Sequence, residues 1–199
     1  MKYPHDVIAA YAPTFLECTA GLSYIRRGVF WSELLAFSAL AHHKGVKHVV
    51  ESGTGLGFSA NVMARLFSHV TTIGQEATPP GLPSNVYPLK GDSWECMWQY
   101  IEAGDAVLID GPKGGEAVLL AQDILACKDN RPSILAVHDC QRDTAARRLL
   151  EEAFPDMWFS DDVAFVADFG YMDDECAAMA ASRGKIFADH GPTLGILVL

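Results

Sequence analysis

Long apolar runs are missing from this 199-residue sequence, and none approaches the roughly 20 residues that a membrane-spanning helix needs. The first residues, MKYPHDVIAAYAPTFLEC, are interrupted by His5, Asp6, Pro13 and Glu17, so they do not resemble a signal peptide. Half of the residues are nevertheless hydrophobic, which indicates a folded globular protein. We therefore expect a folded chain with no membrane partner.

Cysteine pairs of the CxxC type are also absent. The cysteines are widely separated along the chain, at Cys18, Cys96, Cys127, Cys140 and Cys176. Scattered cysteines favour reduced thiols over a disulfide framework or a structural zinc site. This pattern predicts a cytoplasmic protein.

Clusters of basic residues are rare. Arg26-Arg27 and Arg147-Arg148 are the only basic doublets, and the formal net charge is −10. Binding to phosphate backbones needs clustered Lys and Arg, so we expect no nucleic acid partner. An acidic chain suits a small cationic ligand better, although net charge identifies no particular one.

Short apolar runs alternate with helical patterns along most of the chain. We expect strands at residues 46–52, 70–75, 85–89, 106–110, 133–139, 162–169 and 193–199. Helical patterns occupy parts of the first 45 residues and residues 59–69, 93–103, 115–128 and 143–154. This alternation is typical of an α/β protein. We predict a doubly wound, mostly parallel seven-stranded sheet with helices on both faces and an antiparallel C-terminal strand.

No linker or change of composition divides the sequence. We expect a single domain over residues 1–199, with an N-terminal helical cap at 1–45 and an α/β core at 46–199. Between the second and third expected strands, Pro79, Pro80 and Pro83 exclude a normal crossover helix. The oligomeric state is open, and a homodimer is compatible with the sequence.

The segment VVESGTGLGFSA, residues 49–60, joins the first expected strand to its helix. Ligands of open α/β sheets bind at the carboxyl ends of the strands. The residues expected to line such a ligand are Glu51, Gly53, Thr54, Gly55, Gly57 and Ser59. A dinucleotide fingerprint would need glycine at Phe58, and a phosphate-binding P-loop would need a GKS or GKT sequence. A glycine turn without a ligand is the remaining alternative.

Polar residues also follow the second and third expected strands. Glu76 ends the second, where an acid could accept both hydroxyls of a ribose. Asp92 and Ser93 follow the third and could meet an adenine amino group. Their alternatives are a solvated carboxylate at Glu76 and a helix N-cap at Asp92-Ser93.

A third group of candidates follows the fourth and fifth expected strands, with Asp110 in LIDGPKGG and His138-Asp139 in AVHDC. Neighbouring parallel strands bring their carboxyl ends together, so these side chains should meet. Two carboxylates and an imidazole would accept Mg²⁺, Mn²⁺, Fe²⁺ or Zn²⁺, and the histidine disfavours Mg²⁺. The alternative is a hydrogen-bonded pair in which His138 or Asp139 acts as a metal-free base.

The segment ESGTGLGFSANVMARLF…VTTIGQE resembles the cofactor half of the cation-dependent, catechol O-methyltransferase-like branch of the class I S-adenosylmethionine-dependent methyltransferases. It is also similar to bacterial methyltransferases with IDG and HD motifs, and the likeness covers about residues 28–145. The resemblance implies a Rossmann-like fold. It also implies that Glu51 and the glycine loop lie at the methionine portion of the cofactor, Ser59 at its carboxylate and Glu76 at its ribose.

For the catalytic half, the resemblance implies that Asp110, His138 and Asp139 bind a divalent cation and that Lys113 is the general base. His138 replaces a carboxylate of that branch, and Pro112 replaces an aromatic residue. A solvated loop lysine is the alternative for Lys113. We therefore predict methyl transfer from S-adenosylmethionine to a hydroxyl of a small-molecule acceptor. A metal-independent methyltransferase, an inactive cofactor-binding module and an NAD-dependent oxidoreductase are the alternatives.

Overall fold

The computed structural model describes residues 3–25, 28–127, 129–182 and 192–199. These residues form a seven-stranded sheet with the order β3-β2-β1-β4-β5-β7-β6. The strands are β1 (His48–Ser52), β2 (His69–Gly74), β3 (Val86–Lys90), β4 (Ala106–Ile109), β5 (Ile134–Val137), β6 (Trp158–Phe159) and β7 (Gly195–Val198).

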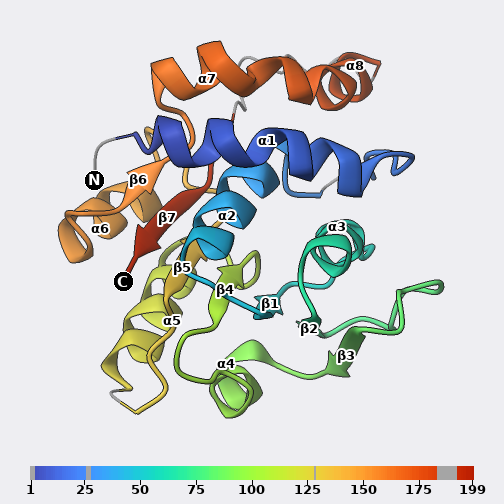
Figure 1. Ribbon diagram of the computed structural model, residues 1–199. Helices are drawn as coiled ribbons and strands as arrows, with labels where there is room; N and C mark the ends of the chain where they lie inside the picture. The colour runs from blue at the N-terminus through green and yellow to red at the C-terminus, as the bar shows by residue number, and fades with distance from the viewer. Residues whose placement is uncertain (1–2, 26–27, 128, 183–191) are drawn as a thin grey trace.

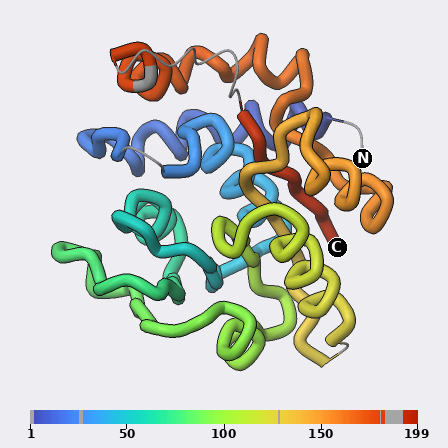
Figure 2. The backbone as a smooth tube through the Cα atoms, turned by 180° about the vertical axis from the view of Figure 1, so that it is seen from behind, coloured from blue at the N-terminus to red at the C-terminus, as the bar shows by residue number. Residues whose placement is uncertain are grey.

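The first five strands are parallel, and β7 runs antiparallel to both β5 and β6. Figure 2 shows the red C-terminal strand inside the molecule, beside the orange segment that carries β6. From β1 the chain proceeds through β2 and β3 toward one edge, and from β4 it proceeds toward the other. The carboxyl ends of β1 and β4 therefore form the switch point of the sheet. The predicted mostly parallel sheet with an antiparallel C-terminal strand is confirmed.

Helices cover both faces of this sheet (Figure 1). They are α1 (His5–Thr19), α2 (Trp31–His43), α3 (Phe58–Leu66), α4 (Ser93–Cys96), α5 (Gly115–Ala126), α6 (Ala145–Ala153), α7 (Val163–Phe169) and α8 (Asp174–Ala181), with 3-10 turns at Met97–Gln99 and Gly170–Asp173. Alternate strand residues face alternate layers: Val49 belongs to the core cluster that includes residues of α1, α2, α3 and α7, whereas Val50 belongs to the cluster that includes residues of α5 and α6. In the described residues no helix is both long enough and apolar enough to cross a bilayer.

Helix α2 lies between α1 and the sheet (Figure 1). Every residue from Trp31 to Ala41 is buried, as expected for a helix that is apolar on nearly all sides. The polar members Ser32, Glu33 and Ser38 are fully buried with the rest. Helix α2 is thus part of the hydrophobic core, and the division into a cap at 1–45 and a core at 46–199 stays a prediction.

One predicted strand is wrong. Within 162–169, residues 163–169 form helix α7 rather than a strand, and the sixth strand is the short β6. The side chain of Asp162 accepts hydrogen bonds from the backbone N–H groups of Ala164 and Phe165 and so caps the helix. Phe165 and Phe169, four positions apart, are the buried residues of α7. Their spacing is helical, but over so short a run it is easily mistaken for strand alternation.

The proline-rich connection between β2 and β3 contains no helix, as predicted. It folds back over the glycine loop instead. A Cβ atom at Gly57 would lie 2.9 Å from Leu82 Cδ2 and 3.0 Å from Pro79 Cγ. This segment therefore covers the start of α3 without the usual crossover helix.

Candidate functional site

The glycine loop touches the end of β4 through its backbone. A Cβ atom at Gly53 would lie 2.9 Å from the carbonyl carbon of Asp110, and the φ of Gly53 is +98°. Both features require glycine at this position. The hydroxyl of Ser52 donates to the carbonyl of Gly111, and the N–H of Asp110 donates to the carbonyl of Ser52 at 2.8 Å. The two loops at the switch point are thus held together by main-chain contacts and by the Ser52 hydroxyl.

Three adjoining pockets share Gly53 as a wall. The first, of about 160 Å³, is lined by Gly28, Gly53, Thr54, Gly55, Leu56, Phe58, Ser59, Glu76 and Asp110. The second, of about 220 Å³, also contains Glu76 and reaches Pro88 and Leu89. The third, of about 260 Å³, is lined by Asp92, Ser93, Trp94 and Pro112, among others. Most of the predicted cofactor-binding residues are therefore brought together at the carboxyl ends of the strands.

Glu51 and Gly57 do not line any of these three pockets. Glu51 is fully buried beneath the loop, where its carboxylate accepts hydrogen bonds from Ser59 Oγ and from Thr72 Oγ1. Burial raises the pKa of Glu51 to about 7, although both hydrogen bonds oppose the rise. Glu51 thus supports the loop from below, and its direct contact with a ligand stays a prediction. Gly57 has a φ of +78° and caps the N-terminus of α3.

Asp92 uses its side chain in a helix cap. Its Oδ1 accepts from the N–H of Trp94 at 2.9 Å, and its Oδ2 accepts from Gln75 Nε2 at 3.2 Å. The N-cap interpretation is therefore correct for Asp92, which also lines the third pocket with Ser93.

The side chains after β4 and β5 form one cluster, as predicted. His138 Nδ1 lies 2.7 Å from Asp110 Oδ1. Lys113 Nζ lies 2.6 Å from the same oxygen and 2.7 Å from Asp139 Oδ2. Asp139 has a φ of +60°, the only positive φ of a described non-glycine residue. This unusual backbone turns its carboxylate toward Lys113 at the end of β5.

Opposite charges within the cluster shift the pKa values of its members. Burial alone would lower the pKa of His138, but Asp110 and Glu33 raise it well above its usual value. Burial raises the pKa of Asp110, whereas His138 and Lys113 lower it and their effect prevails. Burial lowers the pKa of Lys113, yet Asp110 and Asp139 raise it overall. Lys113 is therefore an ion-paired ammonium rather than an isolated solvated side chain.

The same cluster offers a donor set for a divalent cation. One ligand atom each from Asp110, His138 and Asp139 can be chosen so that all lie within 4.8 Å of one another. Two carboxylates and one imidazole suit Mn²⁺, Fe²⁺ or Zn²⁺ better than Mg²⁺. The residues present thus fit such an ion.

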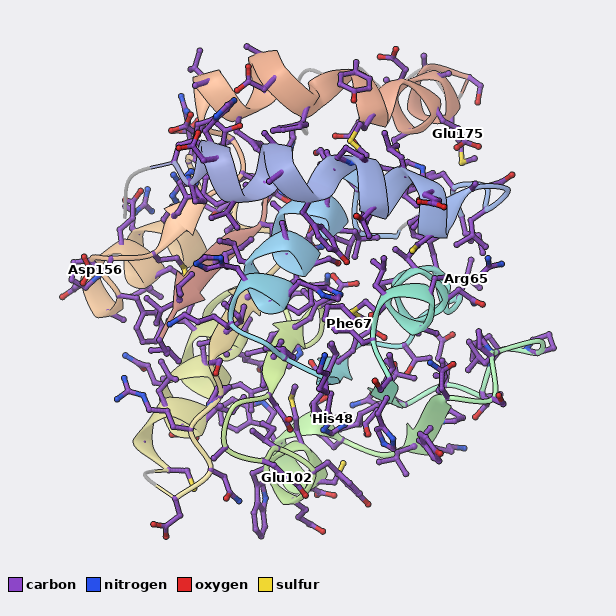
Figure 3. All side chains as sticks on the ribbon, viewed as in Figure 1. His48, Arg65, Phe67, Glu102, Asp156 and Glu175 are labelled. Atoms are coloured by element: carbon purple, nitrogen blue, oxygen red, sulfur yellow. The ribbon has the colours of Figure 1, made fainter. Side chains whose placement is uncertain are left out.

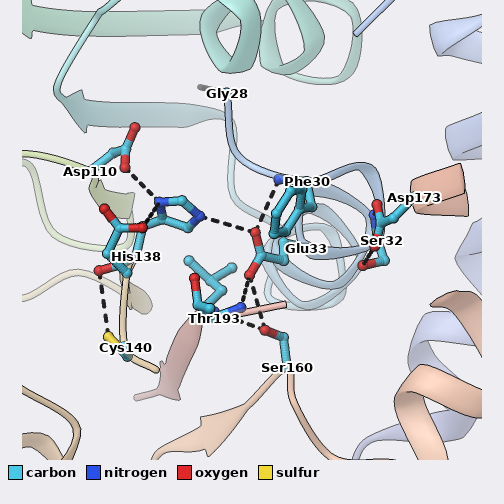
Figure 4. A network of polar contacts seen from close by, with 12 residues as sticks. Gly28, Phe30, Ser32, Glu33, Asp110, His138, Cys140, Ser160, Asp173 and Thr193 are labelled. Atoms are coloured by element: carbon cyan, nitrogen blue, oxygen red, sulfur yellow. Dashed lines mark hydrogen bonds and ion pairs between the residues drawn. The ribbon is translucent and has the colours of Figure 1, made fainter. Parts of the chain in front are cut away.

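Sequence reasoning missed Glu33, which lies on the first turn of α2 and contacts His138 Nε2 through its Oε2 at 3.1 Å (Figure 4). A signal was present in the sequence, because Glu33 is the one acid in the apolar run WSELLAFSALA. An acid within a buried stripe needs a partner, and its partner lies more than 100 positions away.

A second polar cluster lies at the opposite, amino ends of the strands. There His48 Nδ1 lies 2.9 Å from Asp105 Oδ2 and His48 Nε2 lies 3.0 Å from Thr71 Oγ1. Figure 3 shows His48 and Glu102 near one another on this side, where the N–H of Glu102 also donates to Asp105. These bonds satisfy the buried carboxylate of Asp105 and are remote from the glycine loop.

No family model matches the sequence, and no curated protein matches it. The structure is similar to that of a candidate O-methyltransferase from Klebsiella pneumoniae, with a TM-score of 0.50 and 16% identity over 76% of this chain and 80% of that one. The chain has the class I methyltransferase fold.

The structure is also similar to two other solved structures. An O-methyltransferase from Bacillus cereus in complex with SAH has a TM-score of 0.48 and 19% identity, over 77% of this chain and 81% of that one. A precorrin 8w decarboxylase from Methanobacterium thermoautotrophicum has a TM-score of 0.44 and 21% identity, over 57% of this chain. This chain spans 66% of that protein's length. At 16% identity, the likeness to the Klebsiella pneumoniae protein shows the fold and no particular reaction.

Proposed function

We propose that this chain is an S-adenosylmethionine-dependent methyltransferase that methylates a hydroxyl group of a small molecule. One observation carries the proposal: Gly53, the wall common to the three pockets, packs against the backbone of Asp110. An elongated ligand along the glycine loop would therefore reach the Asp110, Lys113, His138 and Asp139 cluster at the switch point.

The lining of the pockets suits the parts of this cofactor. Glu76 is exposed at the end of β2, where its two oxygens could accept both ribose hydroxyls. The pocket beside Asp92 and Ser93 would take the adenine. Ser59 and the start of α3 would face the methionine carboxylate, since a helix N-terminus favours an anion. The sulfonium would then lie beside Asp110, whose negative charge complements it.

Methyl transfer from a sulfonium needs an oxygen nucleophile that is deprotonated and correctly aimed. Lys113 would act as the general base: as the neutral amine it would take the proton of the acceptor hydroxyl, and the oxygen would then bond to the methyl carbon as its bond to the sulfonium sulfur breaks, leaving S-adenosylhomocysteine. Asp110, His138 and Asp139 would hold a divalent cation. Such a cation would lower the pKa of a bound hydroxyl and, by repelling the ammonium, that of Lys113.

Metal-independent methyl transfer is the second candidate. Lys113 and His138 already pair with Asp110, so the chain supplies its own cations to this carboxylate. In this case Asp139 is the better base, because its side chain is 39% exposed whereas that of His138 is 9% exposed. A chelation experiment separates the two candidates.

A calorimetric titration with S-adenosylhomocysteine tests the proposal, with NADH as the competing nucleotide. We expect the parent protein to bind S-adenosylhomocysteine and not NADH. Glu76→Ala should lose about 10-fold or more in affinity, because a charged hydrogen bond contributes about 1.5–3 kcal/mol. Asp123→Ala is the matched control, since Asp123 is an exposed acid on α5 that lines none of the three pockets. NADH binding without S-adenosylhomocysteine binding would indicate an oxidoreductase instead.

A further inference from the structure

Glu33 is a fully buried acid whose hydrogen bonds join four segments of the chain. Its Oε2 accepts from the N–H of Phe30 at 3.0 Å and lies 3.1 Å from His138 Nε2. Its Oε1 accepts from Ser160 Oγ at 3.1 Å and from the N–H of Thr193. Figure 4 shows this carboxylate at the centre of the network, between the α2 helix and the imidazole.

A buried carboxylate is costly unless donors surround it and a positive charge lies nearby. Among the described contacts of Glu33, the backbone groups and the Ser160 hydroxyl are neutral donors. His138 is the contact that can carry a positive charge. The N-terminal turn of α2 adds the favourable end of the helix dipole. Glu33 is thus placed to act on His138 rather than on solvent.

Both ring nitrogens of His138 face a carboxylate, Nε2 at Glu33 and Nδ1 at Asp110. An ionised carboxylate only accepts hydrogen bonds, so Nε2 of His138 must be protonated to donate to Glu33. With Nε2 held in this way, Nδ1 is directed at Asp110 Oδ1 at 2.7 Å. Histidines that bind metals or act in catalysis are commonly oriented by such a carboxylate on the second nitrogen.

We propose that Glu33 is a positioning residue that holds His138 with Nε2 protonated and Nδ1 directed into the Asp110, Lys113 and Asp139 cluster. The inference rests on the proposed methyl transfer for its effect on turnover, and it holds with or without a cation. It makes α2 part of the reacting site, although Glu33 lines none of the pockets that share Gly53.

The segment leading into α2 supports this assignment. Gly28 lines the pocket that also contains Ser59 and Asp110, and a Cβ atom at Gly28 would lie 2.5 Å from Phe58 Cδ1. The short stretch 28–33 thus contributes to the site twice. Gly28 lines the pocket, and Glu33 contacts His138.

The test compares Glu33→Gln with Asp173→Asn. Asp173 is a matched control because it is also buried and also contacts the first turn of α2, accepting from Ser32 N–H at 3.1 Å and Ser32 Oγ at 2.5 Å. Figure 4 shows that pair on the side of α2 away from His138. The first measurement is the ¹⁵N chemical shifts of the His138 ring at one fixed pH. The second is kcat and KM for methyl transfer, with S-adenosylhomocysteine affinity.

We expect Nε2 of His138 to be protonated in the parent protein and in Asp173→Asn. In Glu33→Gln the amide nitrogen takes the place of one carboxylate oxygen. It then faces either His138 Nε2 and Phe30 N–H, or Ser160 Oγ and Thr193 N–H, so at least one donor loses its acceptor. The ring shifts should change and kcat should fall about 10–100-fold, while S-adenosylhomocysteine affinity stays within about twofold.

An unprotonated Nε2 in the parent protein would overturn the proposal. This measurement needs no variant, so it remains a test if Glu33→Gln does not fold. Parent-like ring shifts and kcat in a folded Glu33→Gln would overturn it as well. If no protein binds S-adenosylhomocysteine, the proposed function fails, yet the ring shifts still decide whether Glu33 orients His138.

Discussion

The ammonium of Lys113 and the carboxylate of Asp139 meet at 2.7 Å, although one residue follows β4 and the other follows β5. Lys113 also contacts Asp110 at 2.6 Å, so it links the ends of β4 and β5. A charged bridge in this position orders the two loops and places the residue proposed as general base beside both carboxylates.

Replacing Lys113 by Met removes the ammonium and keeps much of the apolar stem. We expect kcat for methyl transfer to fall about 100- to 10,000-fold, in the range typical of a lost acid or base, with unchanged affinity for S-adenosylhomocysteine. Steady-state kinetics and calorimetry measure the two effects. Lys47→Met is the control, because Lys47 is exposed at the amino end of β1. Parent-like kcat in Lys113→Met would remove Lys113 from the mechanism.

Removal of divalent cations separates the two candidate mechanisms. We expect Mn²⁺ to bind the chelator-treated protein in a calorimetric titration, and Asp139→Asn to weaken that binding, since Asp139 offers one of the three ligand groups. Methyl transfer should stop in EDTA and return with Mn²⁺ more fully than with Mg²⁺. Full turnover in EDTA together with no Mn²⁺ binding would leave the metal-independent route.

The neighbouring glycines Gly53 and Gly55 should respond differently to alanine. Gly53→Ala places a Cβ atom 2.9 Å from the Asp110 backbone at a φ of +98°, so we expect a loss of at least about 2 kcal/mol in unfolding free energy. In Gly55→Ala the nearest atom is 3.8 Å away and the φ of +48° lies in the left-handed helical region, so the loss should be about 1 kcal/mol. Urea denaturation measures both, and equal losses would contradict the close contact with Asp110.

The buried carboxyl of Glu51 should make stability depend on pH. Burial raises its pKa from 4.5 to about 7, so between these values the folded protein holds a proton that the unfolded chain has lost. The unfolding free energy should therefore fall as pH rises through this window, by on the order of 3 kcal/mol in total. Urea denaturation at several pH values should show this slope in the parent relative to Glu51→Gln. A difference between the two proteins that is constant with pH would show that Glu51 does not titrate there.

Local patterns were sufficient to predict most of the sheet. The apolar runs that became β1, β2, β4 and β5 are buried along nearly their whole length, as expected for inner strands of a sheet covered on both faces. The edge strand β3 is mostly exposed, and its prediction rested on a short run between turn-forming residues. The pattern failed at residues 162–169, where the Asp162 cap and the spacing of Phe165 and Phe169 make a helix. Seven residues are too few for periodicity alone to distinguish the two.

The residues of the candidate site were also only partly predictable from the sequence. Asp110, His138 and Asp139 could be placed together from sequence because they end neighbouring strands, and Lys113 follows Asp110 by three positions. Glu33 could not, because its contact with His138 depends on how α2 packs across the sheet. The only sign of this long-range contact in the sequence is an isolated acid within an apolar helix.

A crystal structure of the protein grown with S-adenosylhomocysteine tests the central claim most directly. We predict the ribose hydroxyls on the carboxylate of Glu76, the adenine beside Asp92 and Ser93, and the sulfur facing the Asp110, Lys113 and His138 cluster across Gly53. A ligand bound elsewhere on the molecule, or crystals that never take it up at saturating concentration, would contradict the cofactor assignment and the methyl transfer built on it.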